Sequence, residues 1–505
     1  AGPNERRCVM RNALGYYGGL VVAAKYVLHD PVGSQGVEAE TFFPALRHCV
    51  AVHPILSAAI AGAATEAPQF VRPKALDLRD HVEVLDPESL GVEDTDDIDS
   101  VTLVNERLKK ALIQAHDQPF KDCETIPPWR IVVLPEPPWW GRSPGETFWV
   151  IFTYSHSHGD GKSGLAFHKA FLHGLQQSTD PTSDDRQDHL CTTPTVPLLP
   201  PIEEAADLAI SWSYLLGPLL GAHLPGFISS WFNLRASVTP DPPDMWRGEP
   251  ASYDPNNFRT GVELATFHDW IVAGAVAACR AHGTKLTALL HQLIICALSD
   301  NVPDGSTNFV AQTAVDLRRL IPALGDNDMA VCATGDYEMF PRSGLVETDY
   351  FGEGMWAATR KTSASLATCA GTLQDQPIGL LHYLSNYRAY MESKLGQPRD
   401  SSYELSNIMS FDPTPSRNVA ETANEQQRRC EIGRVVFSQP ANAVGSPISF
   451  NFVTREGGDL VVTLCWQLGA LGVENEVEFA RDVLERFNLD LAMIAADGHA
   501  DPVTP

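Results

Sequence analysis

Basic residues are scarce in this chain: 37 Lys and Arg stand against 63 Asp and Glu among 505 residues, a formal net charge of −26. Nucleic acids and anionic membrane surfaces are bound through basic faces, so this balance argues against both kinds of partner. The ten cysteines are scattered and form no C-x-x-C pair, so neither a zinc ribbon nor a disulfide scaffold is indicated. The chain starts Ala1-Gly2-Pro3 and has no secretory leader there. We therefore expect a cytoplasmic protein.

An unbroken apolar span is also missing. Residues 208–234 contain no Asp, Glu, Lys or Arg, and their length would suit a bilayer span. However, glycines and prolines such as Gly217, Pro218 and Pro225 break the stretch into short pieces. We expect a packed cover between two lobes, with peripheral membrane contact and a true span as the alternatives.

The rest of the chain is apolar enough, at 44% of residues, to bury a large core. Hydrophobic periodicity predicts strands at 20–27, 129–134, 148–154, 309–314, 435–437, 448–453 and 460–466 and helices at 42–52, 101–115, 262–281, 287–297 and 476–495. The same mixture of helix and strand occurs twice. We expect an α/β (α+β) protein with an N-terminal lobe over 1–205, an apolar cover and crossover over 206–255, and a C-terminal lobe over 256–505.

One short segment carries the chemistry. The apolar run 148–154 is followed by Ser155-His156-Ser157-His158-Gly159-Asp160-Gly161-Lys162, and a helix-like stretch comes next. A histidine four residues before Asp-Gly, delivered by a buried strand, is held rigidly enough to act as a general base. His156 is therefore the candidate base, and the alternative is a strand-end histidine that is only capped and solvated.

Two nucleotide-binding motifs match this segment in part. Gly161-Lys162-Ser163 resembles the end of a phosphate loop, but His156 stands where that loop needs a glycine. Residues 159–164 also match G-x-G-x-x-G. That fingerprint needs a second buried strand ending in an acidic residue about 20 residues on, and here residues 178–185 are polar. Neither form of nucleotide binding is favoured.

A zinc site is a stronger alternative. His156-x-His158-x-Asp160 resembles the metal motif of metallo-β-lactamase-like hydrolases, but Gly161 occupies the place of a second-metal histidine. The later histidines follow no ligand-like spacing. A zinc-dependent hydrolase using His156, His158 and Asp160 stays open, although we expect no metal.

The spacing His156-x-x-x-Asp160-Gly161 resembles the H-x-x-x-D-G motif of the CoA-dependent acyltransferase superfamily, which includes chloramphenicol acetyltransferase, plant BAHD enzymes, peptide-synthetase condensation domains and fungal alcohol acetyltransferases. Further stretches resemble the alcohol acetyltransferases in order: residues 11–17, 53–56, 128–130, 246–248, 279–290, 315–318 and 404–407. Three places depart from the superfamily patterns. Ser155 replaces the first of two adjacent histidines of condensation domains, residues 442–447 lack the BAHD signature, and Ile408-Met409 stand where Leu-Gly is expected.

This resemblance implies two chloramphenicol acetyltransferase-like lobes with the active-site channel between them. It also implies that Asp160 points away from substrate and pairs with Arg318, which clamps the loop of His156; Arg319 is the fallback cation. Gly161 and Gly159 would permit close backbone approach. His158 would be a neighbour of the pocket.

Two further pairs of residues are candidates for binding. Ser406 and Asn407 are oxyanion or acceptor candidates, with a capping pair at a strand end as the alternative. Because CoA is anionic, the site needs a local basic rim, for which Arg280 and Lys285 are the candidates.

The function expected is transfer of an acyl group, acetyl above all, from CoA to a hydroxyl or amine of a small or medium hydrophobic acceptor. Acyl-CoA is then a co-substrate, no cofactor is bound, and the protein is a monomer. The alternatives are a stand-alone condensation-type enzyme that uses a carrier-protein thioester, the zinc hydrolase, and a non-catalytic binding protein descended from the family.

Overall fold

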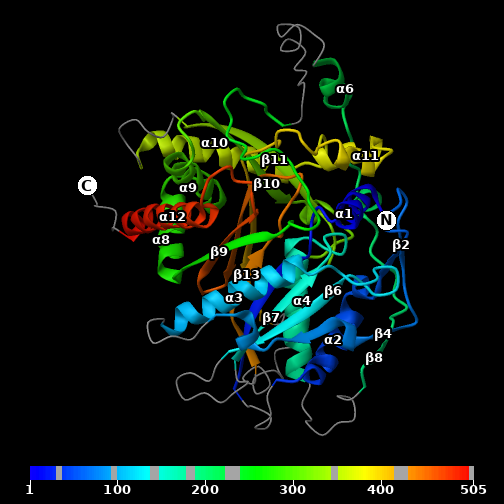
Figure 1. Cartoon of the computed structure of the whole chain (residues 1–505). Helices are drawn as coiled ribbons and strands as arrows, with labels where there is room; N and C mark the ends of the chain where they lie inside the picture. The colour runs from blue at the N-terminus through cyan, green and yellow to red at the C-terminus, as the bar shows by residue number, and fades with distance from the viewer. Residues whose placement is uncertain are drawn as a thin grey trace.

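Two sheet-containing lobes make up the chain (Figure 1). The computed structural model describes residues 1–29, 37–92, 99–136, 147–177, 188–221, 239–342, 351–414 and 430–499. The fold class expected from the sequence, mixed α and β in two lobes, is confirmed. Each lobe has its own extended apolar core.

The first lobe is built on a five-stranded sheet. Its strand order is β13 (Cys430–Ser438), β1 (Leu20–Leu28), β7 (Thr147–Tyr154), β6 (Trp129–Pro135) and β5 (Val82–Val84). All eight residues of β7 are buried, as expected of a strand covered on both faces. Helices α3 (Ser100–Asp117) and α4 (Gly161–Gln177) pack on this sheet, and α2 (Phe43–Val52) packs on α4.

The second lobe is built on a six-stranded sheet. Its order is β11 (Ala333–Pro341), β10 (Asn308–Asp316), β12 (Tyr403–Phe411), β14 (Ile448–Arg455), β15 (Leu460–Gln467) and β9 (Thr260–Phe267). Strand β12 runs parallel to both of its neighbours, and the other pairs are antiparallel. The lobe's helices are α8 (Asp269–Ala281), α9 (Leu286–Asn301), α10 (Glu353–Ala370) and α12 (Glu476–His499).

Shorter elements complete the described chain. The α-helices are α1 (Pro3–Ala13), α5 (Ile202–Ala205), α6 (Trp212–Gly221) and α11 (Tyr387–Glu392), and α1 lies beside α11. The short strands are β2 (Ala59–Ala61), β3 (Gln69–Val71), β4 (Ala75–Asp77) and β8 (Leu190–Thr192). The 3₁₀ helices are η1 (Ala39–Phe42), η2 (Pro54–Ser57), η3 (Leu78–His81), η4 (Pro87–Leu90), η6 (Arg318–Leu320) and η8 (Pro377–Tyr383).

The helix expected over 262–281 is wrong in its first part. Residues 260–267 form strand β9, which pairs antiparallel with β15, and the helix begins at Asp269. The apolar residues of this stretch satisfied a helical pattern, but pairing with a buried strand decides the outcome, because strand propensity depends on the neighbouring strand. Gly261 fits there because it lies flush against Trp466, where a Cβ would come within 2.2 Å of the indole.

Strand β13 joins the two halves of the chain. Its residues come late in the sequence, yet they pair antiparallel with β1 at one edge of the first sheet. In Figure 1 this orange strand lies among the blue and cyan strands. The buried ion pair of Lys109 Nζ with Glu263 Oε2, at 2.8 Å, links α3 to β9 and ties the lobes together a second time.

The apolar stretch 208–234 is described only as far as Gly221, where α6 ends, so the expectation of a packed cover lies largely outside the described residues. Among the residues that the structure places, every helix is too short or too polar to cross a bilayer.

Candidate active site

The loop that carries His156 runs from the end of β7 to the start of α4 and is fixed at both ends. The Ser155 amide donates to the Pro128 carbonyl at 2.8 Å, and the Tyr154 hydroxyl donates to the Asp160 carbonyl at 2.6 Å. Between these ties the His158 amide donates to the Ser155 carbonyl at 2.8 Å, which closes a turn. Turns of this kind hold a loop in one shape at the end of a buried strand.

His156 is the partly exposed residue of this loop, whereas Ser155 and residues 157–160 are buried. Its Nδ1 atom is enclosed and finds no hydrogen-bond partner among the residues that the structure places. The ring of Tyr17 lies 6.0 Å away, centroid to centroid. The loop therefore presents one imidazole outward and keeps the rest of itself inside.

His158 is placed differently, although it stands only two residues further on. It is 1% exposed, its Nε2 lies 2.7 Å from the Ala58 carbonyl oxygen, and its Nδ1 lies 3.1 Å from the Ser157 hydroxyl. Burial lowers the pKa of His158 to about 4, against a smaller opposing effect of the Ala58 carbonyl. Both ring nitrogens are engaged and the ring is neutral, so His158 holds the loop in place.

Asp160 and Arg318 form the ion pair that the resemblance implies. Arg318 donates from Nη2 to Asp160 Oδ1 at 2.7 Å and from Nη1 to Asp160 Oδ2 at 2.8 Å. The side chain of Arg318 is 1% exposed and that of Asp160 is 5% exposed. Arg318 also donates to the Ala330 carbonyl and to Asp316 Oδ1, at 2.8 and 2.9 Å, while Asp160 Oδ2 accepts from the Cys332 amide at 3.0 Å. Burial alone would raise the pKa of Asp160, but Arg318, the Cys332 amide and His156 together outweigh it and the pKa is lowered.

Gly161 lies where the two lobes meet. A Cβ on this residue would come within 2.4 Å of Ile408 Cγ2 and 3.0 Å of Phe437 Cζ, from β12 and β13 respectively. Gly159 is equally confined by the first turn of α4, because a Cβ there would lie 2.4 Å from Ser163 Cβ. Both glycines are therefore required by close packing.

Ser406 and Asn407 lie on opposite faces of β12, because neighbours on a strand point to opposite faces. Asn407 donates from Nδ2 to Thr287 Oγ1 at 3.1 Å, on the side of α9, and accepts from the Met409 amide at 2.9 Å. Ser406, 7% exposed, shares its face with Ile408, which packs against Gly161. Of the two, Ser406 lies on the side of the His156 loop.

Arg280 and Lys285 are both exposed. Arg280 is in the last turn of α8, and Lys285 is the N-cap residue of α9, two residues before Thr287. Lys285 therefore lies close in the chain to Thr287, the hydrogen-bond partner of Asn407.

Helix α1 contributes residues that sequence reasoning missed. Cys8, 1% exposed, lies near enough to His156 for the imidazole to affect its thiol. Burial would raise the pKa of Cys8, but Arg7, His156 and Arg11 together lower it to about 6. The spacing of residues 7, 8 and 11 shows that they share a helical face, but no sequence signal joins that face to residue 156.

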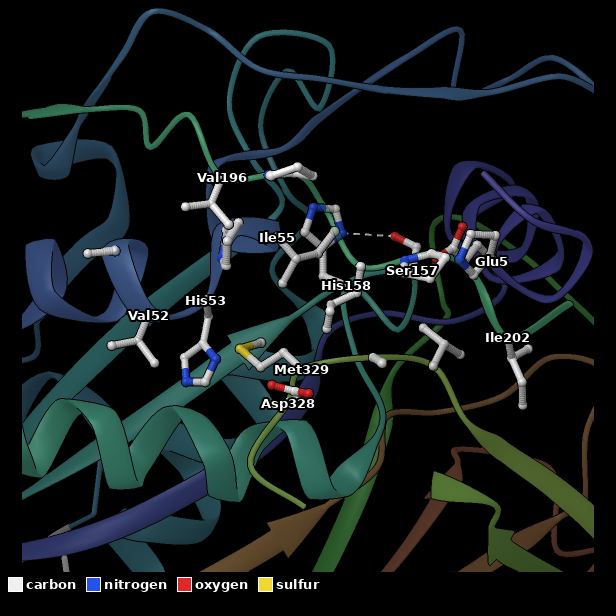
Figure 2. A pocket seen from close by; sticks show the side chains of 18 residues that line it. Glu5, Val52, His53, Ile55, Ser157, His158, Val196, Ile202, Asp328 and Met329 are labelled. Carbon is white, nitrogen blue, oxygen red and sulfur yellow. Dashed lines mark hydrogen bonds between the residues drawn. The ribbon is translucent and has the colours of Figure 1, made fainter. Parts of the chain in front are cut away.

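A pocket of about 200 Å³ lies beside the same loop (Figure 2). Ser157 and His158 line it on the loop side, Glu5 comes from α1, and Asp328 and Met329 come from the segment between η6 and β11. Burial raises the pKa of Glu5 to about 7. Most other lining residues are apolar, among them Val52, Ile55, Val196, Leu199 and Ile202.

The zinc alternative does not fit this geometry. Asp160 is bound to Arg318 through both oxygens, and His158 has both nitrogens engaged. Across the described ranges, no three His, Cys, Asp or Glu side chains are grouped so that they could hold a metal ion.

Comparisons with known proteins agree with the motif. A family model for "Alcohol acetyltransferase" matches residues 97–261. The chain is 24% identical over 474 residues to "Probable alcohol acetyltransferase crmB" of Aspergillus fumigatus, covering 91% of this chain and 92% of that protein. It is 26% identical over 446 residues to "Probable alcohol acetyltransferase FCK4" of Fusarium pseudograminearum, covering 87% and 83%.

Among solved structures, the TRI3 trichothecene 15-O-acetyltransferase of Fusarium sporotrichioides has the same fold, with a TM-score of 0.65 at 14% identity over 97% of this chain and 94% of that one. Motif, relatives and fold agree, and the chain is an acyltransferase similar to the fungal alcohol acetyltransferases.

Proposed function

We propose that the chain moves an acyl group, acetyl above all, from CoA to a hydroxyl of a small or medium hydrophobic acceptor, with His156 as the general base. The observation that carries this proposal is the contrast within one loop: His156 is presented outward from a segment that is otherwise buried and clamped by Arg318. The names of the relatives support a hydroxyl ahead of an amine as the acceptor group.

The reaction needs one proton to move twice. As the acceptor oxygen attacks the thioester carbonyl, His156 removes the hydroxyl proton, and the carbonyl oxygen becomes an oxyanion. When the tetrahedral intermediate collapses, the carbon–sulfur bond breaks and His156 returns the proton to the CoA thiolate. A base of this kind contributes about 10²–10⁴ in rate.

The oxyanion needs a hydrogen-bond donor aimed at it. Ser406 is our candidate, because it lies on the face of β12 that packs toward the His156 loop. Asn407 would act indirectly, since its contacts with Thr287 and Met409 fix the middle of the same strand.

The two substrates would bind on different parts of the molecule. The apolar pocket of Figure 2 is our candidate for the hydrophobic body of the acceptor. Arg280 and Lys285 are our candidates for the phosphates of CoA, which is a co-substrate and not a resident cofactor. We further propose a cytoplasmic monomer that touches membranes at most peripherally, through residues 208–234.

The test is product analysis. The protein is incubated with acetyl-CoA and a panel of alcohols and amines, and release of free CoA is measured together with the mass of the product. We expect esters of hydrophobic alcohols and their loss in His156→Ala. Transfer from a carrier-protein thioester alone, or zinc-dependent hydrolysis without transfer, would overturn the proposal.

A further inference from the structure

Two arginines on one face of α1 lie beside the proposed base. Arg7 and Arg11 are one helical turn apart, and Arg11 is 8% exposed. The Arg11 guanidinium carbon lies 3.7 Å from the centre of the Tyr17 ring, whose own centre is 6.0 Å from that of His156. Arg7 Nη2 lies 3.8 Å from the sulfur of Cys8, which in turn lies near His156.

Neither guanidinium forms an ion pair with a carboxylate among the described residues. Arg7 donates to the neutral Asn4 Oδ1 at 3.0 and 3.2 Å, and Nε of Arg11 is enclosed without an acceptor. Glu404 is near enough to favour the charged form of both, but its Oε1 accepts from Gln439 Nε2 at 3.0 Å and it pairs with neither arginine. Cys8, whose pKa is lowered to about 6, supplies one negative charge to the two guanidinium groups, so one buried positive charge is left without an anion, which is expensive.

We propose that Arg7 and Arg11 form a subsite for a carboxylate carried by the reacting end of one of the two substrates. This inference rests on the proposed function and narrows its substrate class to an acidic one. A planar guanidinium donates two parallel hydrogen bonds to a carboxylate, and two such groups one turn apart converge on a single anion.

The phosphates of CoA are a poor match for this subsite. The phosphates are separated from the thiol by the whole pantetheine arm. The subsite is much nearer to the base, because Arg11 contacts the Tyr17 ring and that ring lies beside His156. The anion must therefore belong to the acceptor alcohol, as in a hydroxy acid, or to the acyl group, as in a dicarboxylic acyl-CoA. In a chain of net charge −26, an anionic substrate needs a local positive centre of this kind.

Binding is tested first, independently of turnover. Sodium decanoate and 1-decanol are compared for their effect on the melting temperature of the wild type, Arg11→Met, Arg7→Met and Arg107→Met. Arg107 is the matched control, because it is also 8% exposed with an enclosed Nε but lies on α3. We expect decanoate to stabilise the wild type and Arg107→Met, with less effect on Arg7→Met and none on Arg11→Met. Equal stabilisation of all four proteins would overturn the subsite.

Turnover measurements then show whether the carboxylate belongs to the acceptor or to the acyl group. One arm compares 10-hydroxydecanoic acid with its methyl ester as acceptor for acetyl-CoA, and the other compares succinyl-CoA with butyryl-CoA as donor to 1-decanol. We expect kcat/KM to favour the acid by at least about tenfold in one arm, and Arg11→Met to abolish that preference.

Preference for the neutral compound in both arms would overturn the inference while acyl transfer itself stands. No transfer in either arm, with decanoate protection still dependent on Arg11, would instead remove the proposed function and keep the carboxylate subsite.

Discussion

Arg318 holds Asp160 across the boundary between the lobes through two hydrogen bonds of 2.7 and 2.8 Å. Arg318 follows β10 of the second sheet, and Asp160 precedes α4 of the first lobe. His156 stands four residues before Asp160, so the orientation of the proposed base depends on a contact made by the other half of the molecule. A displacement between the lobes would act directly on the chemistry.

This pair should show strong coupling in a double-mutant cycle. Asp160→Asn and Arg318→Met each leave an uncompensated charge or donor set in a buried place, at a cost of about 3–5 kcal/mol of unfolding free energy. The double variant should be less damaged than the sum of the two, because neither partner is then stranded. Chemical denaturation of the four proteins measures the coupling.

The control for this cycle is Lys162→Met. Lys162 pairs with Asp316 at 2.9 Å, but both side chains are 22% exposed, so we expect a loss below about 1 kcal/mol. Strict additivity of the Asp160 and Arg318 changes would contradict the pairing of these two residues. Arg319 would then be the next candidate partner of Asp160.

Replacing His156 and replacing His158 should affect different properties of the protein. His156→Ala should lower kcat by about 10²–10⁴ and leave the melting temperature nearly unchanged, because the ring is partly exposed. His158→Ala should mainly lower stability, by about 1–3 kcal/mol, since it leaves the Ala58 carbonyl unsatisfied. Steady-state kinetics beside thermal melting tests both. Equal activity losses at unchanged stability would refute the distinction.

Gly161→Ala should damage stability and activity together. The new methyl group would meet Ile408 and Phe437, which come from two strands and cannot both yield, so we expect a loss of about 1–3 kcal/mol. Gly354→Ala is the matched control, because Gly354 lies in α10 with open space around it and alanine favours a helix. If Gly161→Ala melted with the wild type, the close approach of the lobes at this point would be wrong.

Stability should fall as the pH drops below neutrality. Burial lowers the pKa of a set of histidines from 6.5 to about 4, against smaller opposing hydrogen bonds to backbone carbonyls: His53, His81, His116, His158 and His168. A folded-state pKa below the unfolded value means that the stabilisation is complete above pH 6.5 and is lost as the pH falls toward 4. Each histidine costs up to about 1.4 kcal/mol per pH unit in this window.

Denaturation at several pH values measures this slope. His168→Gln should reduce it by the contribution of about one proton. That ring bonds the Val22 carbonyl and the hydroxyl of Tyr26, whose pKa burial raises well above its usual value, so neither partner titrates between pH 6.5 and 4. A free energy of unfolding that stays flat between pH 6.5 and 4 would show that these rings are charged or solvated in the folded protein.

The sequence is informative where a pattern is local. The buried strand before His156 and the helix after Asp160 follow from a continuous apolar run and a glycine-bounded loop, and the structure has both. The partnership of Asp160 with Arg318, 158 residues apart, could be inferred only from the family resemblance. Periodicity failed at β9, where the partner strand decides between helix and strand.

The contribution of α1 could not be predicted for a related reason. Hydrophobic periodicity predicts no helix over Arg7, Cys8 and Arg11, and only Arg11 belongs to a stretch that resembles the alcohol acetyltransferases. The position of these residues beside His156 exists only once both lobes have packed. The division of roles between Ser406 and Asn407 likewise depends on which face of β12 meets the first lobe.

The position of β13 has a consequence for biosynthesis. A ribosome completes β1, β7 and α4 long before it makes residues 430–438, so β1 waits as an unpaired edge strand while most of the second lobe is synthesised. Such an edge is open to pairing with other chains. Nascent or truncated forms that end before residue 430 should therefore need chaperones to stay monomeric, and a gene split between the lobes would yield an incomplete first sheet that only the other fragment can close.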